Sequence, residues 1–96
     1  MDKKIRQLAR EKASFCSVFG STQRILILWA IADGEMSVSD IAKTTEASLQ
    51  NTSQHLRLMK DKGVVNSRRD GQTIYYRIAE NKYLKSCPIL LNARQT

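Results

Sequence analysis

The residues best suited to molecular recognition lie in the segment 48–57, which is rich in amide, hydroxyl and guanidinium side chains. On a helix, Gln50, Gln54 and Arg57 form one row because they follow each other at steps of four and three. Glutamine can bond adenine through two atoms, and arginine can bond guanine in the same way. The row therefore suits base reading in the DNA major groove, although a solvated surface helix also shows a polar outer face.

The two cysteines, Cys16 and Cys87, are the second group of residues that could carry chemistry. Pro88 disfavours helical geometry at Cys87, so either a helix starts at Pro88 with Cys87 as its N-cap or a helix is kinked there. A thiol at a helix N-terminus near Lys82 and Lys85 ionises more readily, which favours oxidation or binding of a soft thiophile. The alternative is that both cysteines are ordinary buried small side chains.

The length and net charge of the chain limit the classes of protein to which it can belong. The 96 residues predict one domain, and a formal charge of +7 favours a polyanionic partner such as nucleic acid. The longest apolar stretch, 25–32, is far shorter than the roughly 20 residues that cross a bilayer, and the chain does not open on a signal-peptide pattern. We therefore expect a soluble cytoplasmic protein without a membrane partner.

Apolar periodicity predicts two helices in the first third of the chain. Residues 3–18 form an amphipathic pattern that ends near Gly20, and residues 23–33 form a second pattern that stops at Gly34. The second helix is expected to form the centre of the core. Its predicted inner face carries Ile25, Leu28, Trp29 and Ala32, with Ile27 and Ile31 beside them.

Two capping serines predict a pair of short helices. Ser37 begins a helix over 38–44 in which Ile41 and Ala42 face inward, and after a turn at Glu46 and Ala47, Ser48 begins another that ends at Gly63. The buried stripe predicted for this later helix is Leu49, Thr52, Leu56 and Met59.

After Gly63 the pattern alternates, and Asp70-Gly71 between 64–69 and 73–78 predicts a β-hairpin. We expect Arg68 to pair with Thr73 and Val65 with Tyr76. That register turns Val65, Ile74 and Tyr76 inward and Arg68, Tyr75 and Arg77 outward.

A polar helix followed by a basic hairpin is typical of a winged helix-turn-helix, whose helix enters the major groove while its wing meets phosphates. Six basic and two acidic residues give the segment 57–77 a net charge of +4. The fold class predicted is mainly α with a small β-hairpin wing. The predicted DNA-binding residues are Ser48, Gln50, Asn51, Ser53, Gln54, Arg57, Arg68, Arg69 and Gln72.

These residues resemble the ArsR family of bacterial winged-helix repressors over most of the chain. The likeness is carried by the stretches 21–28, 34–42, 53–59, 63–65 and 69–77. The resemblance implies a homodimer through its first and last helices, here 1–19 and 80–94, with the helix-turn-helix at 37–62 and the wing at 64–78. It also implies repression at a palindromic operator that is released by an inducer.

Where many members of the family bind metal through a Cys-x-Cys pair, this chain has Ser37 and Ser39, and residues 80–96 lack histidine. Without thiolate and imidazole ligands, a metal cofactor is not expected at these places. His55 matches a family histidine of the recognition helix with a structural or DNA-proximal role. The inducer expected instead is thiol-directed, such as an oxidant, sulfide or arsenite, acting at Cys16 and Cys87.

Three alternative functions differ from this one. The first is a repressor without a small-molecule sensor, the second is a protein-interaction module whose basic face binds an acidic protein, and the third is an enzyme. An enzyme is not expected, because the sequence carries neither a glycine-rich phosphate loop nor a nucleophile with a plausible base.

Overall fold

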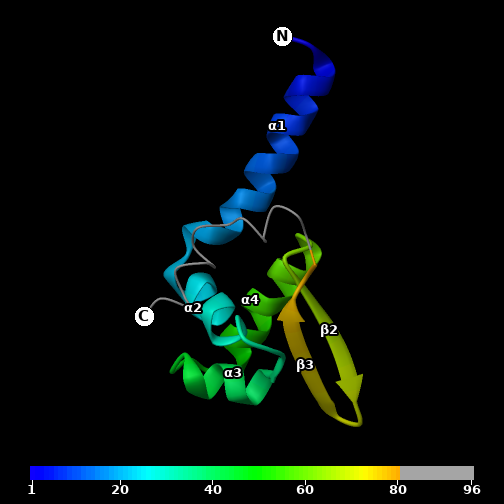
Figure 1. Ribbon diagram of the computed structural model, residues 1–96. Coiled ribbons are helices and arrows are strands. Elements are labelled where there is room, and N and C mark those ends of the chain that lie inside the picture. Colours follow the sequence, from blue (N-terminus) through cyan, green and yellow to red (C-terminus); the bar gives the residue numbers. More distant parts are fainter. Residues whose placement is uncertain (81–96) are drawn as a thin grey trace.

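A computed structural model of the protein describes residues 1–80. Its helices are α1 (Lys3–Cys16), the 3-10 turn η1 (Ser17–Gly20), α2 (Thr22–Ala30), α3 (Val38–Thr44) and α4 (Leu49–Asp61). Its strands are β1 (Met36–Ser37), β2 (Val65–Asp70) and β3 (Thr73–Ile78). The predicted fold class is confirmed: helices dominate, and a small antiparallel sheet flanks them (Figure 1).

Capping explains where the helices begin. The hydroxyl of Ser37 accepts a hydrogen bond from the backbone N–H of Asp40 at 3.1 Å, and that of Ser48 accepts one from Asn51 at 3.0 Å. These contacts satisfy N–H groups that have no partner inside the helix. Gly63 follows α4 with a φ of +79°, a conformation that glycine adopts without steric cost. The predicted limits of α3 and α4 are thus confirmed.

The first two helices are shorter than predicted. The chain tightens into η1 after Cys16, so the helix expected over 3–18 ends two residues early. The helix α2 ends at Ala30 rather than at residue 33 because the N–H groups of Ala32 and Gly34 bond carbonyl groups three residues back in a tight turn.

The core lies where α2, α3, α4 and the hairpin meet. Ile27, Leu28, Ile41 and Leu56 are fully buried there, and the expected stripe residues Thr52 and Met59 are buried as well. Two expectations about inner faces were wrong. Trp29 is 42% exposed, because α2 turns Ile27 and Leu28 inward, and Ile31, which follows the helix, is buried with them. Leu49 is 55% exposed, because the first turn of α4 lies at the surface.

The sheet has the order β1-β3-β2. The short strand β1 was not predicted, since two residues show no periodicity. The hairpin was predicted, but its register was wrong. Arg68 pairs with Tyr75 and Val65 with Ile78, so the loop is Gly71-Gln72 rather than Asp70-Gly71.

A glycine at the first of two loop positions, here with a φ of +64°, suits a tight hairpin turn and fixes this register. Each pair is shifted by two residues, and side chains alternate with a period of two. The predicted faces therefore hold: Val65 and Tyr76 are buried, whereas Arg68 and Arg77 are exposed.

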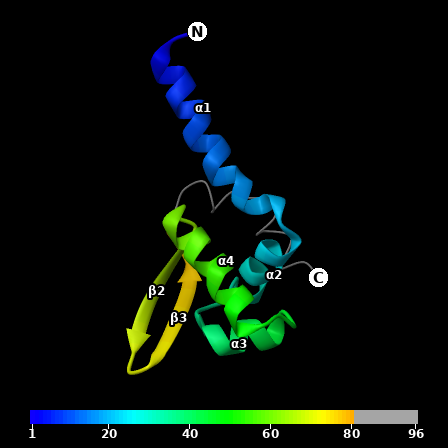
Figure 2. The same cartoon turned by 180° about the vertical axis from the view of Figure 1, so that it is seen from behind.

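The helix α1 projects away from this core. Figures 1 and 2 place its N-terminus at the end of the molecule opposite to α3 and the hairpin turn. Two sets of contacts fix its junction with the core. Arg24 donates to the carbonyl groups of Val18 and Ser17, at 2.9 and 3.2 Å, and the ammonium group of Lys62 bonds the hydroxyl of Ser14. Within residues 1–80, no helix is long and apolar enough to cross a membrane.

Candidate nucleic-acid interface

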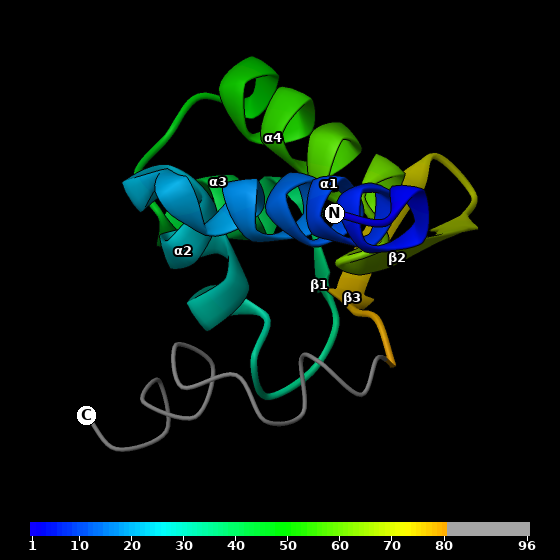
Figure 3. The same cartoon turned by 90° about the horizontal axis from the view of Figure 1, so that it is seen from above.

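The recognition face is the solvent side of α4. Seen from above, with α1 running across the middle of the view, α4 lies along one edge of the core and the hairpin lies beside its C-terminal end (Figure 3). Four of the predicted contact residues line one open hollow of about 520 Å³ together with Leu49; they are Gln50, Ser53, Gln54 and Arg57. Amide, hydroxyl and guanidinium groups are thus displayed on one surface, and all of them are hydrogen-bonding groups that suit base edges and phosphates.

The other two predicted contacts near this face lie at its N-terminal edge. Asn51 is exposed on the first turn of α4. Ser48 is exposed too, but its hydroxyl oxygen already accepts the N–H of Asn51. The hydroxyl of Ser48 is therefore left as a donor, which suits a phosphate oxygen.

The wing reaches the same end of the molecule. A second hollow, of about 240 Å³, lies between the start of α3, the start of α4 and the hairpin turn, and Ser53 and Gln72 both line it. Arg69 is exposed next to the turn on β2. The structure thus brings Gln72 of the wing next to the recognition face, as a winged helix requires.

Arg68 differs from the other predicted contacts because protein groups already hold it. Its Nε donates to Oε2 of Glu35 at 2.9 Å, its Nη2 contacts Oε1 of the same carboxylate, and its guanidinium carbon lies 4.4 Å from the centre of the Tyr75 ring. The hydrogen bond from Arg68 lowers the pKa of Glu35, so the pair stays ionised at neutral pH. Glu35 precedes β1, and the pair therefore ties this connection to the wing. Glu35 was not among the residues predicted from sequence, because its contact with Arg68 depends on the hairpin register.

His55 is partly buried and does not line either hollow. Burial, with a smaller contribution from the positive charge of Arg24, lowers the pKa of His55. The imidazole is therefore neutral at pH 7, in line with a structural role. Among residues 1–80, no three His, Cys, Asp or Glu side chains gather in a way that could hold a metal ion.

Of the two candidate thiols, Cys16 is exposed at the last position of α1. Cys87 lies outside the described residues, as do positions 81–94 of the predicted last helix.

The fold and this surface define a winged helix-turn-helix DNA-binding domain. The profile described as "Bacterial regulatory protein, arsR family" matches residues 21–67. The cadmium resistance transcriptional regulatory protein CadC of Listeria innocua is 33% identical over 84 residues, which make up 86% of this chain and 71% of CadC. The chain therefore belongs to the ArsR family of bacterial regulatory proteins, as the resemblance implied.

Two further relatives agree. The HTH-type transcriptional regulator KmtR of Mycobacterium tuberculosis is 39% identical over 66 residues, covering 69% of this chain but only half of KmtR. The structure is similar to the homodimeric winged helix-turn-helix DNA-binding domain of Mb0332 from Mycobacterium bovis. That match has a TM-score of 0.83 and 27% identity, and it covers 99% of this chain and 85% of that one.

Proposed function

We propose that the protein binds a palindromic DNA operator as a homodimer and represses transcription, acting in the cytoplasm by binding rather than by catalysis. The observation that carries the proposal is that the recognition face and the wing lie at the same end of the molecule, where Ser53 and Gln72 line one hollow. The relatives named as transcriptional regulators and the homodimer of Mb0332 support it. A dimer bound over a promoter represses by excluding the polymerase.

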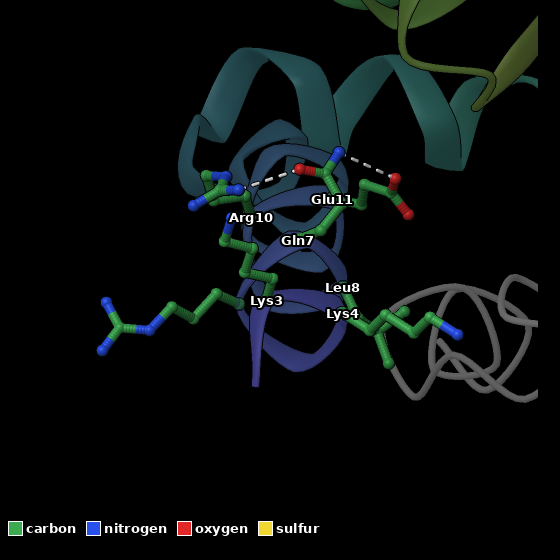
Figure 4. Close-up of a pocket in the computed structure, with 7 residues that line it drawn as sticks. Lys3, Lys4, Gln7, Leu8, Arg10 and Glu11 are labelled. Carbon is green, nitrogen blue, oxygen red and sulfur yellow. Dashed lines mark hydrogen bonds between the residues drawn. The ribbon is translucent and has the colours of Figure 1, made fainter. Parts of the chain in front are cut away.

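The second copy is expected to dock on α1. Within the described part of the chain, this helix has no buried residue, and Ile5 and Leu8 are 52% and 48% exposed on the same side. Polar groups occupy another side, where Arg10 donates to Gln7 and Gln7 donates to Glu11 (Figure 4). An exposed apolar stripe on a projecting helix gains stability by packing against a symmetric copy of itself.

Salt dependence tests operator binding. Genomic fragments selected by the protein supply the operator, and its affinity is then measured by fluorescence anisotropy from 50 to 200 mM salt. A dimer with six to ten phosphate contacts should lose roughly three to five decades of affinity over this range. A scrambled duplex of equal composition is the control. Equal affinity for both duplexes would favour the alternative, a basic surface that binds an acidic protein.

We further propose that Cys16 and Cys87 release the operator in response to a thiol-directed signal. Cys16 is exposed and therefore accessible to a reagent. Two thiols yield two protons and two electrons to an added oxidant as they form a disulfide. Alternatively, they replace two hydroxyl groups of arsenous acid, forming two As–S bonds and releasing two water molecules. Either bond at the dimer interface would change the spacing of the two recognition helices, which must meet sites about 34 Å apart.

For this reason, diamide or arsenite is expected to weaken operator binding by wild-type protein at least tenfold. Cys16→Ser and Cys87→Ser should each abolish the response and leave the affinity under reducing conditions unchanged. Binding titrations with and without each reagent measure both effects. Wild-type behaviour of both variants would eliminate the thiol switch and favour a repressor that lacks a small-molecule sensor.

A further inference from the structure

An apolar side chain lies exposed within the otherwise polar recognition face. Leu49, the first residue of α4, is 55% exposed. It lines both the hollow that contains Gln50, Gln54 and Arg57 and the hollow shared with the wing. Single exposed leucines are common on protein surfaces, so exposure alone decides nothing. The position of Leu49 between two surfaces that are expected to face DNA is what distinguishes it.

The polar neighbours of Leu49 can bond adenine and guanine, but one feature of the base edges, a methyl group, is suited only to an apolar side chain. In the major groove, amide side chains bond adenine and guanidinium groups bond guanine, while the apolar group on a base edge is the C5 methyl of thymine. The glutamines beside Leu49 suit the adenine of an A·T pair, and the thymine of the same or the next pair presents its methyl to the same groove.

We propose that Leu49 is a specificity-determining residue that contacts a thymine methyl group in each half-site of the operator. This inference rests on the proposed operator binding and adds to it a preference for thymine at one defined position. The contact would remove the methyl and part of the leucine side chain from water, which is favourable for both.

Deoxyuridine tests the contact, because it lacks only the C5 methyl of thymidine and keeps the base pair. Each thymidine of one half-site is replaced in turn, and the affinity of the dimer is measured. Wild-type protein should lose about fourfold at one position, the factor that corresponds to about 0.8 kcal/mol for one methyl group. Leu49→Ala should bind the unmodified operator more weakly and show the same affinity with thymidine or deoxyuridine at that position.

Two variants serve as matched controls. Leu58→Ala makes the same change at another exposed leucine of α4, 38% exposed and outside both hollows, and it should keep the wild-type response to deoxyuridine. Leu49→Met retains an apolar side chain and should retain most of the response. Circular dichroism melting curves confirm that each variant is folded, as expected for exposed positions.

The outcomes separate the two proposals. Wild-type protein that binds all duplexes alike would overturn operator recognition, and the thymine contact with it. If the protein binds the operator selectively but Leu49→Ala keeps the full deoxyuridine effect, only the proposed contact of Leu49 is overturned. The same holds if wild-type protein binds selectively and shows no deoxyuridine effect at any position.

Discussion

Reversal of two charges, Arg57→Glu with Arg69→Glu, is expected to weaken operator binding about a thousandfold. It should also reduce the magnitude of the negative slope of log affinity against log salt by about 2. Arg57 belongs to the recognition face, and Arg69 is exposed beside the wing turn. Each guanidinium lost removes an attraction to phosphate or guanine, and each carboxylate gained adds repulsion from the DNA backbone. Anisotropy titrations at several salt concentrations measure both quantities.

The control for this double variant is Lys3→Glu with Arg10→Glu, which changes the net charge by the same amount on α1. Figure 1 places the N-terminal end of α1 far from α3 and the hairpin turn. This control should lose less than tenfold in affinity, because it changes only the long-range field, which salt screens. Duplex affinity that survives Arg57→Glu with Arg69→Glu would contradict the proposed interface.

Arg68 is left out of this test because Glu35 and Tyr75 already engage it. The Nε and Nη2 groups of Arg68 already donate to the Glu35 carboxylate, so only its remaining N–H groups, chiefly those of Nη1, are left for a phosphate. Its geometry better supports a positioning role for the wing, although both partners are well exposed and such pairs contribute little to stability. Arg68 and Arg69 have the same residue type and were both predicted to contact DNA, and the contacts of Arg68 with Glu35 and Tyr75 distinguish them in the structure.

Local signals were sufficient for most of the fold. The limits of α3 and α4 follow from Ser37, Ser48 and Gly63, because capping depends on neighbours within a few residues. The hairpin followed from its alternation, and its faces were predicted correctly even though its register was not. The polar row of α4 was predicted from helical spacing alone, and the structure exposes Gln50, Gln54 and Arg57 as that spacing requires.

The remaining features depend on tertiary contacts that spacing does not encode. Leu49 lies three residues before Thr52, and this helical spacing predicted that both would be buried. The packing that buries Thr52 does not extend to the first turn of α4. The two residues of β1 form a strand only because β3 is available to pair with them. Glu35 contacts Arg68 across 33 positions of sequence. In each case the missing information is which distant element lies alongside.

The dimer is expected to depend on α1, and Ile5→Glu with Leu8→Glu should convert it to monomers. Two apolar side chains from each copy would be removed from an interface in which each contributes about 1.5 to 3 kcal/mol when buried. The dimer dissociation constant should therefore rise by roughly four decades or more. Operator affinity should fall as the dimer dissociates, because a monomer contacts only one half-site. Sedimentation velocity at micromolar concentration measures the oligomeric state, and anisotropy measures operator binding.

Arg6→Ala with Arg10→Ala is the matched control, since it changes the net charge by the same two units on another side of α1. Both arginines are exposed, and the hydrogen bond that Arg10 donates to Gln7 lies at the surface (Figure 4). The control should remain dimeric, because it leaves Ile5 and Leu8 in place. A stable dimer of the Ile5→Glu, Leu8→Glu variant would assign the interface to another surface. Because charge reversal on the recognition face should leave the dimer intact, the two double variants distinguish loss of DNA contacts from loss of assembly.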